Sequence, residues 1–199
     1  RIALLACTYS VNGLPDPARQ ALNCYGDSPS VPALIGDLLA EAGIDGVILL
    51  PHWGAEYTAT PTARQRRLAR AAVAAGASAV VGAHPHVLQP VETVRAPDGR
   101  QGVVAYSLGN FLSSQWALPR RTGAILYMDL TRDARGRVTA QPPRALPTRV
   151  NRYAENGVTV APAALARGGA ASIAHAAAIL GAGRLVSPSD FGTAVRHRG

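Results

Sequence analysis

The apolar residues in the first half of the chain form short runs separated by segments with helical spacing. Apolar, β-rich runs predict buried strands at residues 2–9, 46–50 and 79–81. A helix from Pro32 to Gly43 is expected between the first two strands, because proline suits a first helical turn and glycine a helix end. A second helix, opened by residues 60–62 and ended by Gly76, is expected before the third strand.

This alternation of strands and helices is typical of a parallel sheet, so the predicted fold class is α/β. The strand at residues 46–50 is apolar throughout, as expected for a strand buried on both faces of such a sheet. Residues 10–30 show no period and are rich in Gly, Pro, Asn, Asp and Ser. We expect them to form one long loop, a kind of segment that is usually functional or mobile.

The pattern changes after the third predicted strand, where antiparallel elements make the expected sheet mixed. Strands are predicted at residues 87–94, 103–106 and 123–130 and from Val138, with turns at 97–100 and 133–136. From Pro142 onward prolines interrupt the pattern, and residues 163–185 are expected to be partly helical. We therefore divide the chain into a main segment, residues 1–150, and an Ala-, Gly- and Arg-rich tail, residues 151–199.

Composition narrows the class of protein. The 199 residues suffice for one domain with a real core, and no apolar run is long enough to cross a membrane. All 20 basic residues are arginine, and the net charge of +8 arises mainly from residue 131 onward. This excess suits a polyanion, but aromatic residues are sparse and no nucleic-acid motif occurs, so a nucleic-acid binder is excluded. The two cysteines, Cys7 and Cys24, form either a disulfide in an exported protein or two free thiols.

Three histidines follow two predicted parallel strands at the point where each strand ends. His52 follows the strand at residues 46–50, and His84 and His86 follow the strand at 79–81. Pro85 favours an extended backbone at His84, which would place both imidazoles on one side of the chain. Since the carboxyl ends of parallel strands share one edge of a sheet, these side chains are candidate ligands for divalent zinc, manganese or iron. The alternative is a hydrogen-bonded histidine cluster without metal.

Three further residues are candidates for the same site. Glu56 lies four residues after His52, so a helical turn there would bring the two side chains together and allow general acid–base catalysis or a contact to substrate. The alternative is a solvated carboxylate without a role in the site. Asn110 follows a predicted strand and either binds substrate, orients His84 or serves only as a turn residue. Trp53 either lines a substrate site or packs beneath the loop.

Three separate motifs now resemble one protein family. They are His52-Trp53-Gly54-Ala55-Glu56, the run from Val81 to Gln89 around Gly82-Ala83-His84-Pro85-His86, and Tyr106-Ser107-Leu108-Gly109-Asn110-Phe111. Their order and spacing resemble the CapA family of bacterial poly-γ-glutamate capsule synthesis proteins, over residues 1–150.

This resemblance implies a fold similar to calcineurin-like metallophosphoesterases, an αββα sandwich in which two sheets lie between helices. It implies that His52 is the lone histidine ligand of the metal and that His84 and His86 are the paired ligands. In the metallophosphoesterase superfamily, the other metal ligands come from a Gly-Asp, an Asn/Glu and an Asn-His motif. We do not find these motifs in this chain. Together with the absence of an initiator Met, this suggests the C-terminal part of a longer protein.

The function implied by the resemblance is capsule or envelope polymer biosynthesis, with a metal-dependent hydrolase or transferase site. Its expected partners are an anionic polymer such as poly-γ-glutamate and other capsule-synthesis components, and its expected location is membrane-associated or extracytoplasmic. Two alternatives stay open: a non-catalytic component that binds polymer or an assembly partner, and a metal-dependent phosphoesterase unrelated to capsule.

Overall fold

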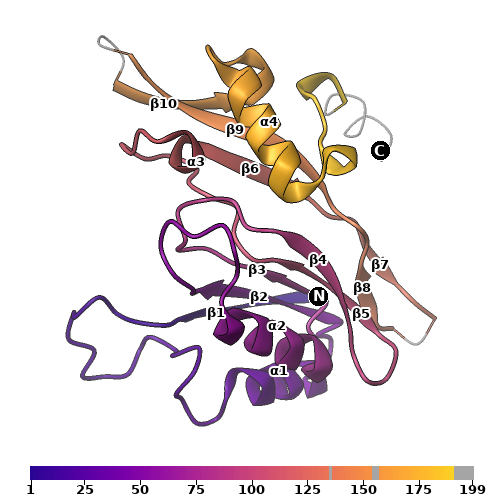
Figure 1. The fold of residues 1–199 in the computed structure, drawn as a ribbon. Coiled ribbons are helices and arrows are strands. Elements are labelled where there is room, and N and C mark those ends of the chain that lie inside the picture. Colours follow the sequence, from indigo (N-terminus) through magenta and orange to yellow (C-terminus); the bar gives the residue numbers. More distant parts are fainter. Residues whose placement is uncertain (135, 154–156, 191–199) are drawn as a thin grey trace.

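A computed structural model describes residues 1–134, 136–153 and 157–190. Two helices cover one face of a five-stranded sheet, and a three-stranded sheet with a further helix lies on the other side (Figure 1). The chain is therefore α/β with both parallel and antiparallel strands, as expected for the fold class. Among the described residues, no helix is both long and apolar enough to cross a bilayer.

The five-stranded sheet is mixed, as the sequence pattern predicts. Its strands, in spatial order, are β1 (Ile2–Thr8), β2 (Gly46–His52), β3 (Ala79–Val81), β5 (Gln101–Ala105) and β4 (Val91–Arg95). The first four run parallel to one another, and β4 pairs with β5 as an antiparallel hairpin at the edge. The carboxyl ends of β2 and β3 are consequently neighbours at one edge of the sheet.

The two helices between these strands form where the spacing predicts them. In α2 (Ala63–Ala75), the Thr62 hydroxyl accepts from the Gln65 backbone N–H and the Gln65 amide accepts from the Thr62 N–H, which is a capping box. Gly76 ends this helix with φ 116°, a conformation that favours glycine. The first helix, α1 (Val31–Ala40), stops at Ala40, three residues before the expected Gly43.

Both helices bury their apolar faces against β1–β3. The cluster includes Ile35, Val47, Leu49, Ala72 and Val73, each at most 1% exposed. One expectation is wrong here, because β1 is not a buried strand. It forms the edge of the sheet, and Leu4 is 67% exposed on it.

A second sheet extends the fold beyond residue 121. It consists of β6 (Thr122–Tyr127), β9 (Arg144–Tyr153) and β10 (Gly157–Pro162), all antiparallel. The predicted strand at residues 123–130 is split, because Leu130 belongs to β7 (Leu130–Arg132), which pairs with β8 (Val138–Ala140). Short helices α3 (Leu118–Arg121), η1 (Ala163–Leu165) and η2 (Ala182–Arg184) and the longer α4 (Gly169–Leu180) complete the described chain.

The prolines after residue 142 do not end the strand pattern, contrary to expectation. Pro147 lies within β9 where that strand pairs with β6 alone, so its missing N–H can face the unpaired side. Residue 150, the expected boundary of the main segment, also lies inside β9. A boundary at this position stays a prediction, and residues 191–199 of the expected tail lie outside the described chain.

A second apolar cluster joins the two sheets. Val103 and Ala105 of β5 share it with Ala145 of β9 and with Ala176 and Leu180 of α4, all less than 5% exposed. The small residues on α4 and β9 allow these elements to approach closely. This cluster sets the position of the segment at residues 108–122, which connects the two sheets and reaches the histidine edge.

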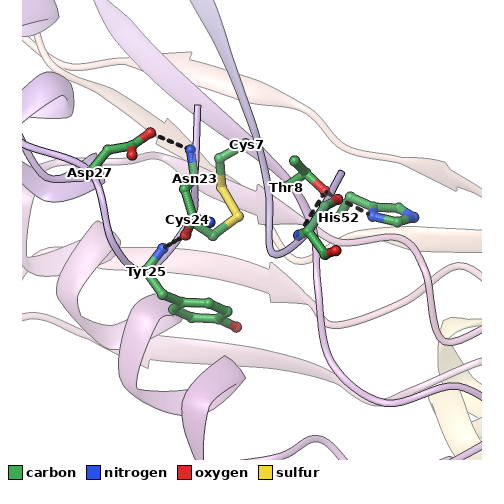
Figure 2. The surroundings of a disulfide bond; sticks show 8 residues. Cys7, Thr8, Asn23, Cys24, Tyr25, Asp27 and His52 are labelled. Atoms are coloured by element: carbon green, nitrogen blue, oxygen red, sulfur yellow. Dashed lines mark hydrogen bonds between the residues drawn. A yellow bond between two sulfur atoms is a disulfide. The ribbon is translucent and has the colours of Figure 1, made fainter. Parts of the chain in front are cut away.

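A disulfide joins Cys7 of β1 to Cys24 in the long loop and thereby decides between the two states of the cysteines left open by the sequence (Figure 2). Next to it, the Thr8 N–H donates to the Leu22 carbonyl and the Cys24 N–H donates to the Thr8 carbonyl, each over 2.9 Å. The disulfide thus attaches residues 10–30 to the end of β1, beside His52.

We expect that replacing both cysteines by alanine lowers the free energy of unfolding by about 3 kcal/mol, because the crosslink closes a loop with a sequence separation of 17. Urea denaturation of the oxidised wild type and the double variant measures the difference. Adding a reductant should destabilise the wild type but not the variant. Equal stability of the two oxidised proteins would contradict the expectation.

Candidate metal centre

The three histidines lie at the shared carboxyl edge of β2 and β3. His52 is the last residue of β2, and a bridge pairs it with Ala83, two residues after β3 ends. The Trp53 N–H donates to the Ala83 carbonyl over 3.0 Å, and the Ala83 N–H donates to the Pro51 carbonyl over 2.9 Å. These contacts bring the ring centroids of His52 and His84 to 4.5 Å and those of His84 and His86 to 5.9 Å.

The backbone of the two later histidines differs from the expected extended form. His84 has φ 101° and His86 has φ 59°, so the segment bends sharply instead of running straight. Positive φ at non-glycine residues costs on the order of 1–3 kcal/mol and persists only where surrounding contacts enforce it. Here the Tyr57 N–H donates to the Pro85 carbonyl over 2.8 Å, and the Gln89 N–H donates to the Ser107 carbonyl over 3.0 Å. The bend therefore still presents both imidazoles to one site.

Glu56, His84 and His86 form a group whose potential ligand atoms all lie within 4.8 Å of one another. The nearest pair is Glu56 Oε1 and His86 Nε2, at 3.8 Å. Glu56 reaches this position from a turn after β2 and not from the helical turn considered from the sequence, and it approaches His86 in place of His52. His52 stands beside the group, in ring contact with His84.

Asn110 determines which nitrogen of His86 is available. The Asn110 Nδ2 group donates to the Arg120 carbonyl over 2.9 Å, which identifies the other amide atom, Oδ1, as the acceptor. His86 Nδ1 lies 2.8 Å from that oxygen and so donates to it. The lone pair of His86 is then on Nε2, the nitrogen that faces Glu56. Asn110 thus orients His86, whereas the sequence suggested His84.

Thr8 gives His52 the same tautomer. The Thr8 hydroxyl donates its only hydrogen to the Ser10 carbonyl over 2.7 Å. It must therefore act as acceptor toward His52 Nδ1, 3.2 Å away. Figure 2 shows this contact between Thr8 and His52. His52 Nε2 retains the lone pair. Hydrogen bonds of this kind from the second ring nitrogen are typical of metal-binding histidines.

Trp53 supports the site from beneath and does not line it. Its side chain is fully buried, and its indole N–H donates to the Tyr106 carbonyl over 2.9 Å. A Cβ on Gly82 would lie 2.2 Å from the indole nitrogen, so only glycine fits between the histidine loop and Trp53. A substrate-contacting position for Trp53, one of its two sequence interpretations, does not fit this burial.

Two buried glutamines, whose roles the sequence did not reveal, fasten the loop that carries Glu56. Gln65 Nε2 donates to Gln89 Oε1 over 2.8 Å, and Gln89 Nε2 donates to the Thr58 carbonyl over 2.7 Å. Both side chains are fully buried. A buried amide that lost its hydrogen-bond partner would cost free energy, because it has already given up its contact with water. These bonds therefore stabilise the loop in its position against α2 and the histidine segment.

Two tyrosines flank the group, and neither was predicted from the sequence. The Tyr9 ring contacts His84 at a centroid distance of 4.7 Å, and the Tyr57 ring stacks with His86 at 5.8 Å. Arg120 in turn lies over the Tyr57 ring, with Cζ 3.7 Å from its centroid. Residues 9, 57 and 120 are far apart in sequence and carry no shared motif, so only the fold brings them together.

Burial lowers the pKa of His84 below that of a free imidazole, and neighbouring His52 lowers it further, while Glu56 opposes the shift. Burial is also the main cause of the lowered pKa of His52, with His86 adding to it and Glu56 opposing it. Both shifts favour the neutral imidazole, which is the form that binds metal.

The donor set fits a divalent metal. Two imidazoles and one carboxylate lie close enough to share one ion, and the His86 ring is oriented by a second polar residue. Mixed nitrogen and oxygen ligands of this kind suit zinc, manganese and iron. Nothing in the arrangement selects one of these metals.

Comparison with known proteins places the chain in a family. The model of the family described as "Bacterial capsule synthesis protein PGA_cap" matches residues 1–115. The "PGA biosynthesis protein CapA" of Bacillus subtilis (strain 168) is 38% identical over 122 residues, which are 60% of this chain and 31% of that protein. The "Capsule biosynthesis protein CapA" of Bacillus anthracis is 43% identical over 84 residues, 42% of this chain and 19% of that protein.

The matches thus cover less than a third of the length of either curated relative. The family match nevertheless includes more than half of this chain and all of its candidate ligand positions, which confirms the resemblance carried by the three motifs. The chain belongs to the bacterial capsule synthesis (CapA) family.

Proposed function

We propose that this chain contributes a divalent-metal site to a protein of poly-γ-glutamate or related envelope polymer biosynthesis. The observation that carries the proposal is the convergence of Glu56, His84 and His86 within 4.8 Å. The names of the two Bacillus relatives support the capsule context. A metallophosphoesterase-like αββα architecture is part of the proposal, supported by the order of layers in Figure 1.

In this proposal His84 and His86 hold the metal through imidazole nitrogen and Glu56 through a carboxylate oxygen, with His52 as a further ligand. When bound, the metal would supply Lewis-acid activation for hydrolysis or transfer at an amide or phosphoester bond. Glu56 is 46% exposed at its side chain, so it can also accept a proton from a group arriving from solvent. Asn110 and Thr8 keep the two imidazoles in the Nδ1–H tautomer.

A non-catalytic polymer-binding component is the second candidate. It is favoured by the small number of carboxylates at the site, because Glu56 is the single acidic member of the group found among the described residues. Metal-dependent hydrolases with two ions usually use several bridging and terminal carboxylates. In this candidate the same histidines contact polymer without metal, His84 as a hydrogen-bond donor and His52 and His86 as acceptors through the Nε2 lone pair, and polymer binding persists after chelation.

We expect the wild-type chain to retain divalent metal after dialysis against zinc or manganese. The His84→Ala/His86→Ala variant should lose at least about 100-fold in metal affinity, since two of the four proposed ligands are removed. Isothermal titration with each metal and elemental analysis measure this.

His175→Ala is the matched control, because His175 lies on α4 and its Nε2 has no hydrogen-bond partner. This variant should bind metal like the wild type. A wild type that binds none of the tested metals, or a double variant with unchanged affinity, would refute the proposed site.

Asn110→Ala should weaken metal binding by about 10- to 100-fold, because it removes the acceptor that holds His86 in the Nδ1–H tautomer. Titration of metal measures the loss, and two-bond ¹H–¹⁵N correlation of the imidazoles reports the tautomer. Ser113→Ala is the control, since Ser113 contacts only the Nδ2 side of Asn110, over 3.2 Å. An unchanged His86 tautomer in the Asn110 variant would show that Asn110 does not orient the ring.

A further inference from the structure

The guanidinium of Arg120 lies near the metal group and has no carboxylate partner in the described part of the chain. Its guanidinium lies over the Tyr57 ring at 3.7 Å, and no ion pair or hydrogen bond from this guanidinium is found among those residues. The next residue, Arg121, is different. Its guanidinium donates to the Val150 carbonyl over 2.9 Å and to Asn151 Oδ1 over 3.2 Å. These hydrogen bonds occupy its donors within the protein by attaching it to β9.

Two separate contacts tie Arg120 to His86. The Arg120 carbonyl accepts from Asn110 Nδ2, and Asn110 Oδ1 accepts from His86 Nδ1. Through its side chain Arg120 contacts Tyr57, which stacks with His86 at 5.8 Å and receives a hydrogen bond from Gln115 Nε2 over 3.3 Å. Arg120 is therefore held next to the metal group by both its backbone and its side chain.

The stacked geometry leaves the guanidinium ready for an anion. A guanidinium that packs its flat face on an aromatic ring keeps its N–H donors in the plane, where they can bind two oxygens of one carboxylate or phosphate. The stacking also restricts the side chain in advance, which lowers the entropy lost on binding. Arg120 is partly buried, lies over a tyrosine ring and has no ion-pair partner in the described part of the chain, which is the form expected of an anion-binding residue.

Local charge supports the same conclusion. Glu56 is the acidic member of the metal group, and its carboxylate repels an anionic chain that approaches His86. The Arg120 guanidinium, which contacts the same Tyr57 ring that stacks with His86, offsets this repulsion and favours an anion beside Tyr57. The net charge of +8 favours the approach of anionic chains in general, but only a positioned cation selects where they bind.

We propose that Arg120, stacked on Tyr57, binds a carboxylate of an anionic polymer chain and holds that chain beside His86. The proposal rests on the polymer context of the proposed function and adds the residue and the chemical group through which polymer is recognised. The same donors would accept phosphate oxygens, so the test compares the two anions directly.

The probe is a fluorescent oligomer of γ-linked glutamate, titrated with the chain in the absence of metal and again with zinc. Arg120→Ala should weaken binding at least about tenfold, because a charge-assisted bidentate contact is lost. Arg120→Lys should recover only part of the affinity, because an ammonium keeps the charge but not the paired donors. Neither variant should change zinc affinity, since the Arg120 carbonyl that orients Asn110 is backbone.

Arg64→Ala is the matched control. Arg64 also lies over a tyrosine ring, Tyr25, at 4.4 Å, but on the outer face of α2. The Arg64→Ala substitution removes the same charge and the same kind of ring contact, and it should leave oligomer binding unchanged. A second control probe is the oligomer with its free carboxylates converted to methyl amides, which the wild type should bind weakly.

The proposal is overturned if the wild type does not bind the oligomer, if Arg120→Ala binds it as the wild type does, or if Arg64→Ala loses as much affinity. It is also overturned if the amidated oligomer binds equally well. Stronger competition by inorganic phosphate than by glutarate would assign Arg120 to a phosphate and contradict the carboxylate assignment. Zinc affinity is measured separately, so loss of the metal site and loss of the anion site are distinguished.

Discussion

The parallel pairing of β2 and β3, continued by the bridge between His52 and Ala83, is the constraint on which the site depends. It ends two strands at one edge and aligns the residues that follow them. Without this pairing, His52 and the His84-Pro85-His86 segment would be separate loops. Buried Trp53 maintains the pairing from below, because its indole bonds to the Tyr106 carbonyl on β5's side of the sheet and leaves room only for glycine at residue 82.

Around this edge, polar residues from distant parts of the chain decide what the histidines can do. Thr8 comes from the end of β1, held near the disulfide, and Asn110 comes from the segment between the two sheets. Each accepts a hydrogen bond from an Nδ1–H and leaves an Nε2 lone pair free. The second sheet is therefore part of the site's construction, because it sets the segment that carries both Asn110 and Arg120.

Much of the fold and the main members of the site could be predicted from sequence. The β1–α1–β2–α2–β3 order follows from apolar periodicity and from local signals such as the Thr62 cap and Gly76, which depend only on neighbouring residues. Strand edges and pairings depend on remote partners, and these were less well predicted. The exposure of Leu4 on β1 and the continuation of β9 through Pro147 are examples.

The sequence by itself determined that His52, His84 and His86 would meet, because parallel strands bring their carboxyl ends to one edge, and its motifs identified the family. Only the tertiary structure decided how they meet. The bent backbone at His84 and His86, the approach of Glu56, the tautomers set by Thr8 and Asn110, and the stacking of Arg120 on Tyr57 all arise from contacts between segments distant in sequence. Local propensity and spacing carry no information about such contacts, because packing of the whole chain selects them.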